Sequence, residues 1–442
     1  MDFVSGGILC IALLLILMAM GLQIGLSFLL SGMLISALLL GFGSSLSLLG
    51  QVAYFSIATP TWACIPLFIL MGSFAAIGGF ARRAYNGVNA LSYGVPGSLG
   101  IATCFSCAVF GAVSGSSIAT TAIFGKMALP EMNRLQYDKS FSTGCIASAG
   151  TFASMIPPSM MMIIYALFTQ QSVGKLFAAG ILPGLLTAGT YAAMILYRVK
   201  RNPRLAPSSA ALQSRSRDGG RWKEAGQMWP VIIIAAVVLG GIYSGWFTPT
   251  EAAAAGSLIT LVFGWILGSF RKIGEVTGAM KESANTTAML FLINIGALFY
   301  SRVLAVTRLP TELTMLLQNL DVPRILILLG ILGIMFLLGM IMVPVGIYAL
   351  TLPIVFPMLV TLGYDPIWFG VIALKLTEIG SITPPVGLNV YAMKGVVPKE
   401  MNISLENIFR GVWPFCVCDI VVLVFLIMFP QISLWLPNLL LG

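Results

Sequence analysis

The sequence contains no histidine among its 442 residues, and only 9% of its residues are charged. A soluble globular domain carries about 25% charged residues, so this chain lacks the polar surface that such a domain exposes to water. Without histidine, no Ser-His-Asp set and no histidine-containing metal site can form. No glycine-rich loop of the phosphate-binding kind is present either. The composition therefore argues against a soluble protein and gives an enzyme no recognisable catalytic machinery.

Cysteine offers no alternative metal or redox site. All seven cysteines lie in apolar surroundings, including the pair Cys104-x-x-Cys107. Because no histidine is present to complete a metal site, we interpret this pair as small residues within a helix. We therefore expect no cofactor apart from a coupling ion.

Long apolar runs are what the sequence does contain, since 58% of its residues are hydrophobic. A bilayer core needs about 20 apolar residues per helix, and the chain has roughly a dozen uncharged stretches of nearly that length. These stretches do not alternate with a period of two, which favours helices over an outer-membrane barrel. The first stretch, residues 4–21, lacks a basic flank and a clear cleavage site, so we expect a retained helix. The sequence predicts an all-α polytopic protein of a bacterial inner membrane, surrounded by lipid.

The formal net charge of +9 is better explained by membrane topology than by binding of nucleic acid. Eight Lys and Arg residues crowd the stretch 198–223, and we expect the basic loop 198–227 in the cytoplasm. That choice places 19 of the 24 Lys and Arg residues on the cytoplasmic side and both termini in the periplasm. The spans expected around the repeated elements described next are 4–21, 24–42, 62–80, 228–245, 250–269, 286–305 and 407–430.

Each half of the chain has a Pro-Pro pair inside an apolar span. Pro157-Pro158 interrupts a span over 141–168, and Pro384-Pro385 interrupts a span over 366–397, at an offset of 227 residues. Successive prolines remove two backbone donors and push the preceding residue out of the helical region. One such pair is often only a kink. Two pairs at matching places predict two helices broken at mid-membrane depth, which is typical of a transport site.

A second feature repeats at the same offset. Gly115 corresponds to Met342, and each lies between two apolar arms that are too short to cross a bilayer alone. Such arms predict re-entrant helical hairpins over 98–130 and 325–360. With the basic loop inside, the first hairpin opens to the cytoplasm and the second to the periplasm. The two halves are therefore expected to be inverted repeats.

Broken helix ends in lipid leave carbonyls and amides unpaired unless something binds them. Sodium prefers hard oxygen ligands, which unwound backbone and Ser or Thr hydroxyls supply. We therefore predict one sodium site in each half. The first draws on Ser114, Gly115, Ser116, Ser117, Ala153, Ile156, Pro157 and Pro158. The second draws on Gly339, Gly380, Thr383 and Val386.

The half-helices that begin at the breaks direct their positive dipole ends to the midplane, where a carboxylate or sulfonate is favoured. Thr383 carries the only side-chain oxygen between Ser381 and Asn389, so its hydroxyl is the sharpest candidate ligand. The alternative is that this hydroxyl only bonds a neighbouring carbonyl, as threonine commonly does in membrane helices. We expect a small organic anion to contact Ser116, Thr383, Pro385 and Asn389.

Three ionisable residues remain inside the second half: Lys375, Glu378 and Asp419. Ionisable residues within membrane spans are functional candidates by default. The alternative is a structural pair of Lys375 with either Glu378 or Asp419. The sequence leaves the choice of partner open.

Three motifs resemble the large membrane subunit of the tripartite ATP-independent periplasmic (TRAP) transporters, and the resemblance covers essentially the whole chain. They are Val113-Ser114-Gly115-Ser116-Ser117-Ile118-Ala119, Met155-Ile156-Pro157-Pro158-Ser159 and Glu378-Ile379-Gly380-Ser381-Ile382-Thr383-Pro384-Pro385-Val386-Gly387-Leu388-Asn389. The resemblance implies a sodium-driven importer of the ion transporter superfamily with an elevator motion. It also implies a small four-helix membrane subunit and a periplasmic substrate-binding protein as partners.

The sequence is similar to the family in its organisation but departs from it at one place. Val343 stands where family members often carry an acidic residue. Because the chain begins with its first large-subunit helix, we expect the small subunit to be a separate polypeptide. The expected division is 1–97 (scaffold helices), 98–197 (first transport repeat), 198–227 (basic loop), 228–305 (scaffold helices) and 306–442 (second transport repeat and last helix).

Other functions compete with a sodium symporter that depends on a binding protein. The nearest is a stand-alone carrier of the ion transporter superfamily, which would share the hairpins and the inverted repeats. A channel can also use re-entrant hairpins, but no selectivity-filter motif is evident. A membrane enzyme is disfavoured by the absence of histidine and the shortage of acids in the spans.

Overall fold

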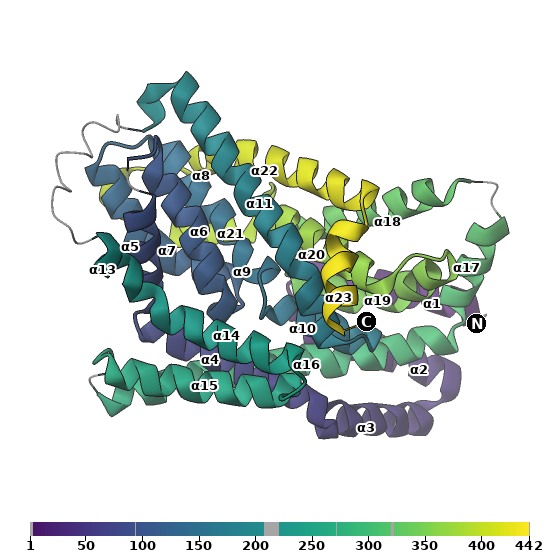
Figure 1. Cartoon of the computed structure of the whole chain (residues 1–442). Coiled ribbons are helices and arrows are strands. Elements are labelled where there is room, and N and C mark those ends of the chain that lie inside the picture. The colour runs from purple at the N-terminus through teal and green to yellow at the C-terminus, as the bar shows by residue number, and fades with distance from the viewer. Residues whose placement is uncertain (1–2, 93, 207–220, 271, 320–321, 442) are drawn as a thin grey trace.

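A computed structural model describes residues 3–92, 94–206, 221–270, 272–319 and 322–441. All regular secondary structure in these described residues is helical (Figure 1). The first half contains α1 (Phe3–Ala19), α2 (Ile24–Leu40), α3 (Phe42–Ala58), α4 (Cys64–Ile77), α5 (Phe80–Leu91), α6 (Ser98–Ser114), α7 (Ser117–Arg134), α8 (Lys139–Ala149), α9 (Phe152–Met155), α10 (Met160–Thr169) and α11 (Val173–Arg201).

The second half begins after the segment 207–220 and is again helical. It contains α13 (Arg221–Ala225), α14 (Trp229–Tyr243), α15 (Pro249–Ile266), α16 (Ile273–Val306), α17 (Leu309–Asn319), α18 (Arg324–Gly339), α19 (Pro344–Thr361), α20 (Pro366–Ile382), α21 (Leu388–Val396), α22 (Leu405–Met428) and α23 (Gln431–Leu441). Short 3₁₀ turns cover Pro60–Ala63, Pro203–Leu205, Gly226–Met228 and Lys399–Met401.

The chain is a multi-pass membrane protein by the length and composition of its helices. Within the described residues, seven helices are long and apolar enough to cross a bilayer, or eight if the bent pair formed by 139–155 and 160–169 is one span. The two parts of that pair meet at an angle of 44°. The predicted all-α polytopic fold is confirmed.

Each half contains the expected hairpin and broken helix. In the first half, α6 and α7 are joined at Gly115, whose φ of 62° is the left-handed conformation that glycine adopts without strain. In the second half, α18 and α19 are joined over 340–343. The chain is non-helical at 156–159 and again at 383–387, around the two Pro-Pro pairs. Both Pro-Pro bonds are cis.

The structure adds helices that the spans did not include: α3, α5, α11, α17 and α23. Of these, α11 is itself long and apolar enough to cross a bilayer. It also lengthens one, because α16 begins at Ile273, well before the expected start at 286. Lys281 and Glu282 lie in this extension and interrupt the apolar run, so the sequence did not predict it as part of a span. Both residue types are nevertheless compatible with a helix. The basic loop is shorter than predicted, since α11 continues to Arg201 and α13 starts at Arg221. Arg215 and Arg217 lie outside the described residues.

Small residues allow the helices to approach closely. Gly144 of α8 meets Gly411 of α22 backbone to backbone, and Gly25 of α2 lies against Leu292 and Ile293 of α16. Close backbone approach through glycine is a common basis of helix association in lipid. The centre of the molecule is α20, in which every residue from Ile367 to Ile382 is buried.

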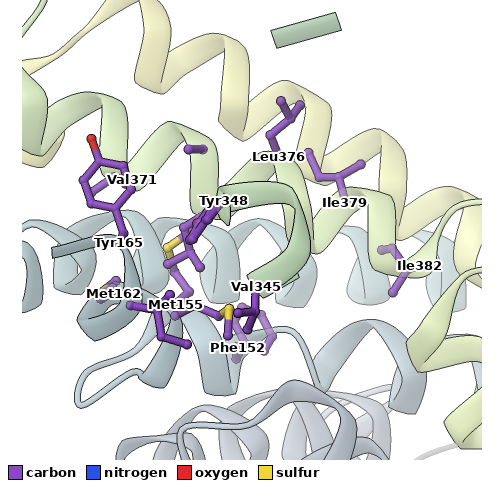
Figure 2. Packing of buried hydrophobic residues seen from close by; sticks show 14 of the residues in the cluster. Phe152, Met155, Met162, Tyr165, Val345, Tyr348, Val371, Leu376, Ile379 and Ile382 are labelled. Atoms are coloured by element: carbon purple, nitrogen blue, oxygen red, sulfur yellow. The ribbon is translucent and has the colours of Figure 1, made fainter. Parts of the chain in front are cut away.

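Side chains from both halves form one core around α20. Tyr165 of α10 and Tyr348 of α19 lie with their ring centroids 5.9 Å apart. Figure 2 shows these two tyrosines with Met155 from the first half and Ile379 from the second. Both chain termini lie toward the end of the molecule away from α5 and α13 (Figure 1).

Candidate functional site

The first hairpin tip contacts the first Pro-Pro break. A Cβ added to Gly115 would lie 3.3 Å from both the Pro158 carbonyl oxygen and the Met160 amide nitrogen. One turn earlier, Gly111 of α6 lies against the backbone of Ala153 in α9. Only glycine permits this approach at both positions, so the sequence Gly111-x-x-x-Gly115 determines how the hairpin meets the break.

The second hairpin and the second break meet in the same way. Gly380 of α20 lies against Gly339 at the end of α18, where a Cβ on Gly380 would be 2.7 Å from the Gly339 carbonyl oxygen. The Val386 amide donates a hydrogen bond of 3.2 Å to the Met340 carbonyl oxygen. The structure therefore brings Gly339, Gly380 and Val386 together, as the sequence predicted for this group.

The first predicted group is largely buried, and some of its hydroxyls are already engaged. Ser114 Oγ lies 2.8 Å from Thr120 Oγ1, and Ser116 Oγ accepts a 3.4 Å hydrogen bond from the Ala119 amide as the N-cap of α7. Ser114, Gly115, Ser117, Ala153, Pro157 and Pro158 are buried, and Ser116 and Ile156 are half-buried. The oxygens that remain available in this group are chiefly those of the backbone.

Thr383 lies at the end of α20 and is 8% exposed. Its hydroxyl donates a 2.6 Å hydrogen bond to the Ile379 carbonyl oxygen one turn earlier. This bond matches the structural alternative for Thr383 and uses the hydroxyl proton. The oxygen also lies 3.9 Å from Cys416 Sγ, which can donate to one lone pair and leaves the other for a cation. The geometry is thus compatible with both roles.

Four half-helices begin at the hairpin tips and the breaks, and they differ in their caps. Ser116 caps α7, and Ser159 caps α10 by accepting a 3.4 Å hydrogen bond from the Met162 amide. In contrast, α19 begins after Val343 and α21 begins after Gly387, and neither has a side-chain cap among the described residues. The first three amides of α21, those of residues 388–390, are therefore free to bind an anion. At α19 only the Val345 amide is free in the first turn, because Pro344 has no N–H and the next two amides donate to the Val343 carbonyl oxygen.

Asn389 strengthens the case for an anion at the start of α21. Its side chain is 0% exposed, and both its amide nitrogen and its amide oxygen lack a hydrogen-bond partner within the described chain. Buried polar groups are nearly always hydrogen-bonded, so this amide is expected to have a ligand. Pro384 and Pro385, next to it, are exposed. The structure places Thr383, Pro385 and Asn389 on one break, and Ser116 on the hairpin whose α7 packs beside α21.

The structure also settles which acid pairs with Lys375. Lys375 Nζ lies 2.5 Å from Asp419 Oδ1 of α22 and 3.2 Å from Thr187 Oγ1 of α11. The Tyr191 hydroxyl donates to the other carboxylate oxygen of Asp419 at 2.7 Å. This buried network joins α11, α20 and α22 beside the second break. Glu378, the other candidate, has no basic partner at ion-pair distance within the described ranges.

One residue near the breaks was missed. Ser154 of α9 is 1% exposed and lies three residues before Pro157, as Ser381 lies three residues before Pro384. The offset of 227 residues relates the two serines, so the repeat itself held the signal. No group of three or more Cys, Asp or Glu residues suited to a metal ion occurs in the described chain.

Comparison with known proteins agrees with these features. The family model described as "Tripartite ATP-independent periplasmic transporter, DctM component" matches residues 11–432. A C4-dicarboxylate TRAP transporter large permease protein of Pseudomonas aeruginosa is 35% identical over 380 residues, covering 86% of each chain. An ectoine/5-hydroxyectoine TRAP transporter large permease protein of Ruegeria pomeroyi is 33% identical and covers 85% of each chain.

Two further proteins bear on architecture. An isethionate TRAP transporter permease protein DctMQ of Oleidesulfovibrio alaskensis is 31% identical, over 87% of this chain and 59% of that one. The crystal structure of the YdaH transporter of Alcanivorax borkumensis superposes with a TM-score of 0.62 at 16% identity, covering 90% of each chain. That similarity concerns the fold. The chain belongs to the DctM family, the large permease components of the tripartite ATP-independent periplasmic transporters.

Proposed function

We propose that this permease imports a small organic anion, carrying a carboxylate or a sulfonate, by coupling it to sodium in an elevator motion. The observation that carries the proposal is the contact of each hairpin tip with the Pro-Pro break of its own half. Discontinuous helices at corresponding places in two repeats are the best structural indicator of a transport site. The chain moves its substrate without a chemical step.

Sodium is the proposed coupling ion because the breaks offer oxygens without a formal charge. In the first half these are the carbonyls around Gly115 and Pro157-Pro158, which lie in contact. In the second half they are the carbonyls around Gly339 and Gly380, together with the Thr383 hydroxyl. Unwound carbonyls at half-helix ends are the usual sodium ligands in transporters of this architecture.

An anion is the proposed substrate because the starts of α19 and α21 are uncapped and Asn389 has an unpartnered amide. The names of the relatives point the same way, since those of P. aeruginosa and O. alaskensis are named for C4-dicarboxylate and isethionate, both small anions. The name of the R. pomeroyi relative, for ectoine, shows that a net negative charge is not universal in this family. The carboxylate or sulfonate is therefore proposed as the group held at α21.

Two partners and a location follow from the same assignment. We propose a small four-helix membrane subunit that docks on the exposed apolar faces of the scaffold helices, and a periplasmic protein that delivers substrate. The DctMQ name of one relative fits a permease joined to a small subunit. We also propose a bacterial inner membrane as the location, with the basic segment 198–223 in the cytoplasm and both termini in the periplasm, because Lys and Arg are enriched in cytoplasmic loops.

The test is uptake into proteoliposomes that contain this chain and its small subunit, with the binding protein outside. Candidate carboxylates and sulfonates are supplied with and without an inward sodium gradient. We expect uptake of one class to require both the sodium gradient and the binding protein. Uptake that does not depend on sodium would contradict the proposal, and full sodium-dependent uptake by this chain alone would favour the stand-alone carrier.

A further inference from the structure

Glu378 is a buried carboxylate that the proposed sodium and anion sites do not use. It lies one turn before the end of the fully buried part of α20 and is 3% exposed. Its Oε1 atom has no hydrogen-bond partner in the described chain, and its Oε2 atom lies 3.4 Å from Ser381 Oγ. The Ser381 hydroxyl meanwhile donates to the Glu378 carbonyl oxygen at 2.7 Å. One oxygen of this carboxyl is therefore left for a ligand.

The groups around Glu378 come from both halves of the chain. The hydroxyls of Ser154 in α9 and Ser117 at the start of α7 face the carboxyl, in addition to Ser381. The Tyr348 hydroxyl of α19, which has no hydrogen-bond partner among the described residues, lies near it as well. The Glu378 carboxyl therefore lies close to residues of the first hairpin, the first break and the second hairpin, in addition to α20 itself.

The repeat relates these neighbours to one another. Ser154 and Ser381 occupy equivalent positions in the two halves, 227 residues apart. Glu378 has Thr151 as its equivalent, so the carboxyl occurs in one half only. A pair of equivalent serine hydroxyls around a single carboxylate forms an oxygen-rich cage at the boundary between the repeats.

An ionised Glu378 would need a positive partner in this cage. Lys375 is paired with Asp419, so that pair is neutral, and an ionised Glu378 adds one negative charge that no described side chain offsets. An isolated buried carboxylate is very unfavourable. Protonation on Oε2 would remove the charge and let the carboxyl donate to Ser381 Oγ, but Oε1 would still lack a partner. A bound cation satisfies both the charge and the free oxygen.

We propose that Glu378, with the hydroxyls of Ser154, Ser381 and Ser117, binds one sodium ion in addition to the sodium ions at the two breaks. This inference rests on the proposed sodium coupling and adds to it a site between the repeats. The carboxylate and hydroxyl oxygens are the hard ligands that such a cation takes. Because ligands from both halves of the chain contribute, occupancy of this site couples the two halves.

The experiment measures the number of sodium ions bound per complex rather than the uptake of substrate. The purified complex of this chain with its small subunit is equilibrated with saturating ²²Na⁺, and bound sodium per complex is measured for the native chain and for Glu378→Gln. We expect the variant to bind one sodium ion fewer. The exposed glutamate variant Glu312→Gln is the matched control and should keep the native count. An unchanged count in a folded Glu378→Gln complex would overturn the proposal.

Ser154→Ala provides a second route if Glu378→Gln does not yield a folded complex. It retains the carboxylate and removes one hydroxyl ligand, so the saturating count should stay native while half-saturation of one ion rises about 5- to 30-fold. Ser142→Ala removes a buried hydroxyl that bonds Asp138 instead and should leave the curve unchanged. A native curve for Ser154→Ala would count against the site. Failure of sodium coupling itself differs from these results, because the native complex would then show no sodium-dependent uptake.

Discussion

Thr383 ends α20 immediately before Pro384-Pro385, and its hydroxyl proton is used by the Ile379 carbonyl. Replacing it in Thr383→Val keeps the branched shape and removes the oxygen. If the lone pairs bind sodium, the lost group is worth about 1–3 kcal/mol, which is about a five- to hundred-fold weaker apparent sodium affinity. Uptake measured against sodium concentration should show this shift, and raised sodium should partly restore uptake.

The matched control for Thr383→Val is Thr169→Val. The Thr169 hydroxyl is also buried and donates to the carbonyl four residues earlier, that of Tyr165, at 2.7 Å. It lies at the far end of α10 from the break, so its loss should not alter the sodium dependence. If both variants have the native half-saturation point, Thr383 has only the structural role.

The Lys375–Asp419 pair is predicted to be structural. Asp419→Asn leaves a buried ammonium without its counter-charge, which in buried pairs costs about 3–5 kcal/mol. The double variant Lys375→Met/Asp419→Leu removes both charges and should recover most of that loss. Unfolding by SDS titration measures both. Equal stability of the single and double variants would mean that Lys375 does not depend on Asp419.

At the residue scale the sequence predicted which residues lie together at the second break, but not how the buried charges pair. Gly339, Gly380 and Val386 do meet, because glycine lets the two backbones approach closely and Pro-Pro ends α20 beside them. The partner of Lys375 could not be chosen, since Glu378 shares its helix while Asp419 lies on another, and only packing decides between them. Ser154 was missed although the repeat offset would have indicated it.

At the scale of elements, hairpins and broken helices were predictable because Gly and Pro mark their ends. The helices α3, α5, α11, α17 and α23 were not predicted, and the sequence explains two of these cases. The α5 sequence is amphipathic and carries Arg82 and Arg83, so it does not form an apolar run. The α17 sequence is short and begins with an acidic first turn. Long apolar runs identify many membrane spans, although α11 was missed while being long and apolar enough to cross a bilayer. Such runs also do not report helices that lie along or beside the spans.

The contact between α8 and α22 is predicted to depend on glycine. A Cβ at Gly144 would overlap the backbone of Gly411, and the two helices would have to separate. Gly144→Ala should therefore destabilise the protein by about 1–3 kcal/mol, as overpacking typically does. SDS titration of the purified chain measures the change.

Gly189→Ala in α11 is the control for that variant. A Cβ at Gly189 would meet nothing within 4 Å. Alanine in place of a helical glycine gains about 0.5–1 kcal/mol when the space is open, so this variant should be neutral or slightly stabilised. Equal destabilisation of both variants would show that the space between α8 and α22 is not the cause.

At the scale of the whole molecule, the elevator proposal divides the chain into a moving and a static part. The moving part holds both hairpins and both breaks, because these surround the sites, and helices such as α2 and α15 frame it. Inverted repeats that share a central site commonly work by rigid-body motion of one part against the other. Each part should therefore keep its internal contacts while the contacts between the parts change.

The helix α4 permits a direct test of this division. It has one aromatic contact with the moving part and one with the frame, and the two ring pairs have the same centroid distance. Phe68 of α4 lies with its ring centroid 6.1 Å from that of Phe177 in α11, which belongs to the first transport repeat. Phe74 of the same helix lies 6.1 Å, centroid to centroid, from Phe270, which follows α15 in the frame.

In a background without the seven native cysteines, Phe68→Cys/Phe177→Cys and Phe74→Cys/Phe270→Cys are cross-linked with the same reagent. Uptake by the first pair should fall to the fraction of molecules left uncross-linked and return on reduction, while uptake by the second pair should persist. If the first pair transports normally when fully cross-linked, α11 does not move against α4, and the proposed division of the molecule is wrong.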